Sequence, residues 1–232
     1  MPRGGTAIER GNIYHLISRF VAKEWFIESS VERRGYLALL GPAIERTDWR
    51  LFCYAVMSSH IHLGVVAGTT SLASWMRPMH TTFANWVNTR RERIGAVFVR
   101  GPNVIDVRPA DAAELIRYVH LNPVRAVVVD RASESDWTSH RAYLGSERRP
   151  IWLDVDSGLE LAGFTSREDF GAWVEHDRDV DPAIVAQLSP KLGRGRRTKK
   201  KSDYLTRKLR TRCPSDGHAR HQPLERAFGE DG

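Results

Sequence analysis

Two histidines stand two residues apart in the apolar stretch 54–66, YAVMSSHIHLGVV. Side chains at positions i and i+2 of a β-strand point to the same face of the sheet. A strand over 60–66 would therefore hold His60 and His62 side by side on one face. Two imidazoles at this spacing are half of a site for a divalent metal ion. The pair is equally compatible with two strand histidines that make ordinary hydrogen bonds, so on its own it leaves both interpretations open.

A tyrosine and an asparagine share one side of a helix expected at 111–126, DAAELIRYVHLNPVRA. Tyr118 and Asn122 are four residues apart, so they project to the same side one turn apart. The Asn122 amide oxygen could be a third metal ligand beside two imidazoles, and the Tyr118 phenol could then reach a phosphate held there. The alternative is a solvated tyrosine at the helix edge, followed by an asparagine that ends the helix before Pro123.

Alternating and helical patterns predict the elements that must position these groups. Strands are expected at 12–20, 49–57 and 60–66, and two short apolar runs within 96–108 suggest a hairpin or a bent strand pair. Amphipathic helices are expected at 29–46 and 72–87, with weaker helical character at 166–176. Pro42 and Pro78 predict a kink or a break in the first two helices.

This order of elements predicts an α+β fold with a ferredoxin-like antiparallel sheet. The two early helices would pack on one face of the sheet. The helix that carries Tyr118 would lie on the other face, beside the strand that carries His60 and His62. We expect residues 1–130 to form this domain, 131–178 to extend it, and 179–232 to be a basic, disordered tail.

The charge of the chain points to a polyanionic partner. The net charge is +7 over 232 residues, and the segment 191–212 alone carries eleven Lys or Arg and one Asp. That segment has a net charge of +10, which leaves −3 for the remainder. Nucleic acid is the expected partner, and the alternative is a solvated charge run. The N-terminus lacks a secretory signal, no apolar run approaches the roughly 20 residues of a membrane span, and Cys53 and Cys213 fit no zinc or disulfide pattern. We therefore expect a cytoplasmic protein without membrane association.

Several segments together resemble one known family. Met57-Ser-Ser-His60-Ile-His62-Leu63 resembles the His-hydrophobic-His (HUH) motif of the HUH endonucleases, as it is used by single-tyrosine transposases. The segment 118–126, YVHLNPVRA, resembles the tyrosine helix of their REP-associated branch. Three flanking segments agree in order, and the similarity covers roughly residues 10–178. These segments are YHLISR at 14–19, GAVFVR at 95–100 and WTSHRAYL at 137–144.

The resemblance has departures. The family often has Pro-Asn before the first histidine, where this chain has Ser58 and Ser59. Pro78 in the second helix is unexpected for the family, and residues 179–232 have no recognised counterpart.

The resemblance implies a DNA transposase that nicks and rejoins single-stranded DNA through a 5′-phosphotyrosine intermediate. It implies Tyr118 as the nucleophile and a Mg²⁺ or Mn²⁺ held by His60, His62 and Asn122. The implied partner is single-stranded or hairpin DNA, bound by a monomer or a homodimer in a bacterial cytoplasm, at the nucleoid when on DNA. The candidate phosphate contacts are Arg19, Arg100, Arg117 and Arg125.

Two other functions compete with this one. A non-catalytic protein of the same fold could bind single-stranded or hairpin nucleic acid. A histidine-triad nucleotide hydrolase is disfavoured, because its chemistry needs a further histidine at position 64, which is Gly64.

Overall fold

The predicted order of elements is present in the computed structural model, which describes residues 7–176 and 182–188. Three of the four strands lie within one or two residues of the predicted spans. The strands are β1 (Ile13–Arg19), β2 (Arg50–Val56), β3 (His60–Val66) and β4 (Asn103–Val107). They form one antiparallel sheet in the order β2-β3-β1-β4, which confirms the ferredoxin-like arrangement.

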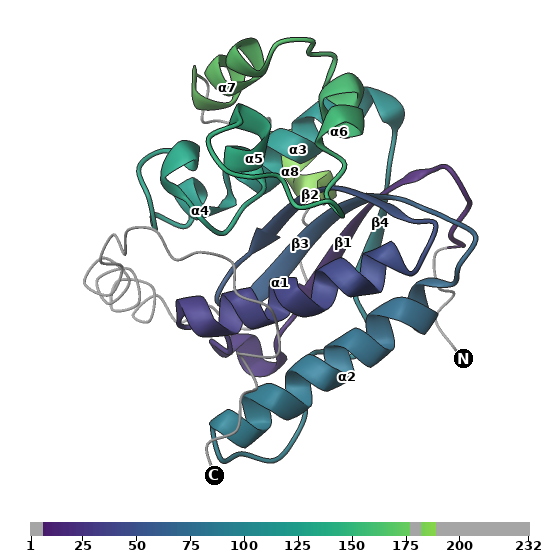
Figure 1. Ribbon diagram of the computed structural model, residues 1–232, viewed down its shortest axis with the longest axis vertical. Helices are drawn as coiled ribbons and strands as arrows, with labels where there is room; N and C mark the ends of the chain where they lie inside the picture. The colour runs from purple at the N-terminus through teal and green to yellow at the C-terminus, as the bar shows by residue number, and fades with distance from the viewer. Residues whose placement is uncertain (1–6, 177–181, 189–232) are drawn as a thin grey trace.

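Two long helices cover one face of this sheet, as expected (Figure 1). They are α1 (Ser30–Glu45) and α2 (Leu72–Arg90). The N-terminus of α1 is closed by a capping box in which Ser29 and Glu32 satisfy each other's main-chain N–H groups. Pro42 and Pro78 do not break the helices, because both lie inside uninterrupted helices. Packing of these helices outweighs the backbone hydrogen bond that each proline removes.

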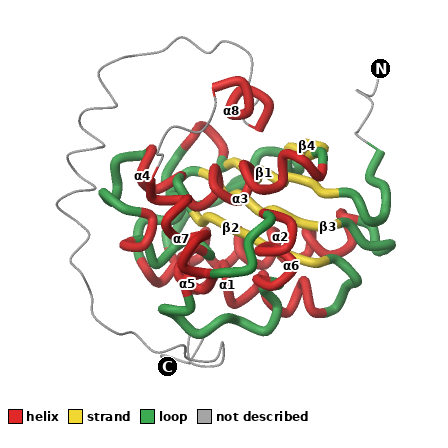
Figure 2. The backbone as a smooth tube through the Cα atoms, turned by 90° about the horizontal axis from the view of Figure 1, so that it is seen from above, coloured by secondary structure: helices red, strands yellow, loops and turns green. Residues whose placement is uncertain are grey.

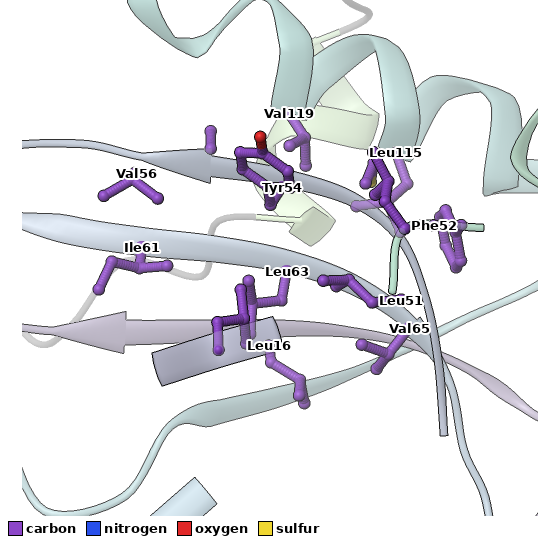
Figure 3. Close-up of a cluster of buried hydrophobic side chains, with 14 of the residues drawn as sticks. Leu16, Leu51, Phe52, Tyr54, Val56, Ile61, Leu63, Val65, Leu115 and Val119 are labelled. Atoms are coloured by element: carbon purple, nitrogen blue, oxygen red, sulfur yellow. The ribbon is translucent and has the colours of Figure 1, made fainter. Parts of the chain in front are cut away.

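The tyrosine helix lies on the opposite face of the sheet and is split in two. Helix α3 (Ala112–His120) is followed at once by α4 (Asn122–Arg125), with Leu121 at the joint. The helix expected at 111–126 is therefore interrupted at Leu121, directly before Asn122 and Pro123. Leu115 and Val119 of α3 contribute to the apolar cluster in Figure 3, together with strand residues such as Leu16 and Leu63.

Of the hairpin and the bent strand pair expected within 96–108, the structure excludes the hairpin. Only β4 is a strand there, and the preceding run pairs with the chain that follows β1, through a bridge between Phe20 and Phe98. The Val99 N–H also donates to the Arg19 carbonyl at 2.8 Å. The two apolar runs thus extend one edge of the sheet in succession, because each finds a partner in β1 or its continuation.

Short helices after residue 130 close the other edge of the sheet and gather around α3 (Figures 1 and 2). Thr138 forms an antiparallel bridge with Ala55 of β2, and the Val56 N–H donates to the Trp137 carbonyl at 2.9 Å. The extension therefore continues the sheet at the β2 edge. These helices are η3 (Ala132–Glu134), α5 (His140–Leu144), α6 (Val155–Ala162), α7 (Arg167–His176) and α8 (Pro182–Leu188). Two short helices come earlier in the chain, η1 (Val21–Lys23) and η2 (Pro109–Asp111).

Part of the predicted disordered tail is ordered. Residues 182–188 form α8, and Leu188 is buried against the core. The basic segment 191–212 lies outside the described residues. Among the helices that the structure describes, none is long and apolar enough to cross a membrane.

Candidate functional site

The two histidines of β3 stand on the face of the sheet that α3 covers. Their ring centroids are 4.7 Å apart. Nδ1 of His60 lies 3.0 Å from the Ser59 hydroxyl, so the turn before the strand orients this ring. A side-chain hydrogen bond also joins His60 to Asn122. The predicted side-by-side arrangement and the approach of Asn122 to the pair are therefore both present.

A third histidine completes this group from the neighbouring strand. Nε2 of His15 in β1 lies 2.8 Å from Nδ1 of His62, and the two rings stack with centroids 4.9 Å apart. Nε2 of His62 is buried and has no hydrogen-bond partner among the described residues. The bond to His15 therefore occupies one nitrogen of His62 and leaves the other available to a ligand.

All three imidazoles are neutral at ordinary pH. Burial lowers the pKa of His15 to about 3, although the main chain of Leu188 opposes this shift. Burial and the nearby Arg19 lower the pKa of His60 to about 4. Burial, then the two neighbouring histidines, place the pKa of His62 well below its ordinary value. Neutral imidazoles keep a lone pair, which a metal ligand requires.

Tyr118 packs directly on these histidines in the same chain. Its ring meets the His62 ring edge-on at 5.6 Å and the His15 ring at 5.8 Å between centroids. Asn122, one turn later, donates from Nδ2 to the Tyr118 carbonyl at 2.9 Å. This bond uses the amide nitrogen of Asn122 and ties its side chain to the turn of helix that carries Tyr118. The shared helix side predicted for Tyr118 and Asn122 is thus present.

A fully buried chain of hydrogen bonds anchors the helix that carries the tyrosine. Nε2 of His120 lies 2.8 Å from the Ser139 hydroxyl, and Nδ1 lies 3.2 Å from Nδ1 of His140. The Ser139 oxygen also accepts the Tyr54 N–H of β2 at 3.0 Å. His120, Ser139 and His140 are all inaccessible to solvent. His120 therefore fixes α3 to the sheet edge and to α5, away from the reacting groups.

The four candidate arginines have different surroundings. Arg19 is the cross-strand partner of His60, and Arg100 is exposed in the loop before β4. Arg125 is exposed, and its guanidinium carbon lies 5.3 Å from the centre of the Tyr118 ring. The expectation for Arg117 needs correction: it is 4% exposed, pairs with Glu114, and lies over the Trp173 ring at 5.0 Å. An arginine enclosed in this way presents no guanidinium surface to DNA.

The residues present suit a divalent cation of moderate softness. Within the described residues, no three His, Cys, Asp or Glu side chains are arranged to hold a metal ion. A site here would therefore use two imidazoles and the Asn122 amide oxygen. Nε2 of His62 has no hydrogen-bond partner among the described residues, and Asn122 is hydrogen-bonded to His60, whose ring is adjacent to that of His62. Imidazole and amide donors suit Mn²⁺ at least as well as Mg²⁺.

The fold is similar to that of a solved transposase. A REP-associated tyrosine transposase bound to a REP hairpin is similar, with a TM-score of 0.54 and 14% identity, over 67% of this chain and 93% of that one. A putative transposase from Deinococcus radiodurans aligns at a TM-score of 0.37 and 17% identity, over 51% and 95% of the two chains. Neither family models nor curated sequences give a match. The chain therefore shares the fold of the first of these transposases.

His15 is the site residue whose role the sequence pattern did not reveal. Its position two residues before Ile17 places it on the face shared with His62, because Ile17 is the cross-strand partner of His62. This inference requires the register between β1 and β3, which the alternating pattern of either strand alone does not supply.

Proposed function

We propose that this protein is a metal-dependent DNA transposase that nicks and rejoins single-stranded DNA through a 5′-phosphotyrosine intermediate. The observation that carries the proposal is the contact of the Tyr118 ring with His62 and His15, in a site where Asn122 is hydrogen-bonded to His60. A nucleophile, two imidazoles and an amide converge in one chain, and the fold is that of a solved tyrosine transposase.

The candidate metal ligands are His60, His62 and Asn122. A divalent cation bound there supplies Lewis-acid stabilisation of the charge on a phosphodiester. His15 keeps the His62 ring oriented through the bond to Nδ1, and Ser59 does the same for His60. Such outer contacts fix the tautomer and the direction of a ligating imidazole.

Tyr118 is the proposed nucleophile. Its phenol loses a proton to solvent, and the phenolate oxygen attacks the phosphorus in line. The bond from phosphorus to the 3′-oxygen breaks, and that oxygen leaves as a hydroxyl after it takes up a proton. A second 3′-hydroxyl can then attack the phosphotyrosine and release Tyr118, so the phosphodiester is rebuilt without an added energy source.

Arg125 is placed to assist this step. A guanidinium beside the Tyr118 ring is positioned to attract the incoming phosphate. Arg19, beside His60, adds a second positive charge on the same face of the sheet. The proposed DNA partner, single-stranded or hairpin, is consistent with the hairpin bound by the similar transposase.

The test is the formation of a covalent adduct. The full chain is incubated with Mn²⁺ and a labelled hairpin oligonucleotide that carries single-stranded flanks, and the products are separated on a denaturing protein gel. We expect a labelled protein band that disappears with Tyr118→Phe, with His62→Ala or with a chelator. Tyr54→Phe is the matched control, since Tyr54 is a buried tyrosine of β2 outside the site. Salt-sensitive DNA binding without an adduct under any metal would instead identify a non-catalytic binding protein.

A further inference from the structure

A cavity lies on the opposite side of the sheet from Tyr118. It occupies about 630 Å³ between α2 and the segment 96–102 that leads into β4. This volume falls within the roughly 300–1,000 Å³ range of small-molecule sites. Leu72, Met76 and Ala84 of α2 give it an apolar wall, and Phe98 faces them from the segment.

The cavity is connected to the end of the sheet where the catalytic candidates lie. The Val99 N–H donates to the Arg19 carbonyl at 2.8 Å, and the Val97 carbonyl accepts from the Val21 N–H at 3.0 Å. Arg19 is in turn the cross-strand partner of His60. One strand therefore separates the wall of this cavity from the proposed reaction centre, and a strand of DNA that leaves the centre over this edge would meet the cavity.

The interior of the cavity has a flat aromatic surface. The rings of His80 and Phe98 stack with centroids 4.0 Å apart and an angle of 11° between their planes. The Tyr36 hydroxyl lies 3.3 Å from Nε2 of His80 and holds that ring in place. Burial lowers the pKa of His80 to about 4, so this surface is uncharged at neutral pH. Nucleobases stack on such surfaces.

Two exposed cations accompany this apolar interior. Arg77 from α2 and Arg100 from the segment both line the cavity, and no acidic side chain lines it. An apolar aromatic interior with two guanidinium groups matches a base with its adjoining phosphates. The same charges disfavour the protein's own segment 191–212, whose net charge is +10.

We propose that this cavity binds one unpaired nucleotide of the DNA substrate outside the reaction centre. The base enters the cavity beside the stacked rings of His80 and Phe98, and its phosphates contact Arg77 and Arg100. The proposal rests on the proposed DNA-processing function, because it takes single-stranded DNA as the partner.

The experiment measures binding of the full chain to a labelled hairpin with single-stranded flanks by fluorescence anisotropy, without divalent metal. Each flanking nucleotide is replaced in turn by an abasic nucleotide. We expect one position at which the loss of the base weakens binding roughly five- to hundredfold, the range for one stacked base. In Ala84→Trp, which fills the cavity, binding of the intact oligonucleotide should fall by a similar factor, and the abasic replacement at that position should have no further effect.

Asn85→Trp is the matched control, since Asn85 is exposed on α2 and does not line the cavity. Should Ala84→Trp fail to fold, Arg77→Gln gives a second readout. It should reduce the slope of log affinity against log salt by about one, whereas Arg90→Gln, at the end of the same helix, should change that slope less.

The outcomes separate the two proposals. If each abasic replacement weakens DNA binding by the same factor in Ala84→Trp as in the unmodified protein, no base occupies the cavity and this proposal fails. If the Tyr118 adduct forms normally in that case, the transposase proposal survives alone. If one abasic replacement weakens binding to the unmodified protein but not to Ala84→Trp, and no adduct forms under any metal, the cavity proposal stands and the catalytic one fails.

Discussion

Nε2 of His15 and Nδ1 of His62 lie 2.8 Å apart, and both side chains are buried. Two neutral imidazoles in this contact share one proton. If His62 donates from Nδ1, its Nε2 carries a lone pair, and His15 must carry its own proton on Nδ1. The main chain of Leu188 raises the pKa of His15, which is the effect of a carbonyl close to a ring N–H. Nδ1 of His15 makes no hydrogen bond of ordinary geometry. We infer that His15 selects the ligating tautomer of His62.

The first prediction concerns metal affinity. His15→Ala should weaken the binding of Mn²⁺ roughly 10- to 100-fold, the usual effect of losing a residue that orients a ligand. His15→Gln keeps an acceptor near Nδ1 of His62 and should restore part of the affinity. Isothermal titration of the DNA-free protein with Mn²⁺ measures this without reference to activity. His80→Gln, which removes a histidine on the other side of the sheet, should leave the affinity unchanged. Equal affinities for all three variants would exclude an orienting role.

The second prediction concerns the arginine beside the nucleophile. Arg125→Gln should slow adduct formation roughly tenfold or more, because the negative charge on the phosphate in the transition state loses the guanidinium beside Tyr118. Arg125→Lys should be intermediate, since the charge remains without the planar group. The measurement is the single-turnover rate at saturating DNA, with Arg90→Gln as a surface control. A slower rate in the control of the same size would indicate a nonspecific charge effect.

The third prediction concerns the anchor of α3. Ser139→Ala leaves the His120 nitrogen and the Tyr54 N–H without partners in a buried place. Each unsatisfied buried group costs about 1–3 kcal/mol, so the free energy of unfolding should fall by at least that amount. Urea unfolding followed by circular dichroism gives this value. Ser146→Ala removes an exposed hydroxyl, which donates to the Arg141 carbonyl, and should change it by less than about 0.5 kcal/mol.

The fourth prediction concerns pH. Burial places the pKa of His140 and His80 at about 4 in the folded protein, and the pKa values of His15, His60, His62 and His120 are lowered as well. The unfolded chain, with histidine pKa values near 6.5, binds more protons between pH 4 and 6.5. Stability is therefore fully present above pH 6.5 and is lost as pH falls toward 4, by up to about 1.4 kcal/mol per pH unit for each histidine.

Urea midpoints at pH 7.0, 6.0 and 5.0 test this dependence. His80→Gln should reduce the dependence of the free energy of unfolding on pH by up to about 1.4 kcal/mol per pH unit, because the variant lacks this buried neutral imidazole. A free energy of unfolding that is constant from pH 7 to pH 5 would contradict the burial of neutral imidazoles.

The fifth prediction concerns Gly64, two residues after His62. A methyl group there would overlap Sγ of Cys53 and approach Cε2 of Phe52 to 2.8 Å. Gly64→Ala should lower the free energy of unfolding by about 1–3 kcal/mol. Cys53→Ala in the same chain should recover part of that loss. Urea unfolding compares the unmodified protein, the two single variants and the double variant. The same overlap explains why no third histidine fits at this position of the strand.

Local sequence patterns were sufficient for the elements and for part of the site. The alternation in 60–66 places His60 and His62 on one face, and the spacing of Tyr118 and Asn122 places them on one side of a helix. These are properties of one strand and one helix turn, so residue spacing alone determines them. The order of the elements then limited the sheet to the ferredoxin-like arrangement that the structure shows.

Tertiary structure decided everything that depends on a partner distant in sequence. Arg117 and Arg125 look alike in sequence, yet Trp173 of α7 packs on the first, while the second is exposed. The apolar run at 97–99 joins the end of β1 instead of β4, and α8 brings Leu188 to His15. The sequence by itself determined which faces carry the chemical groups. Strand register and long-range packing decided which groups meet, because these contacts join residues with no local pattern in common.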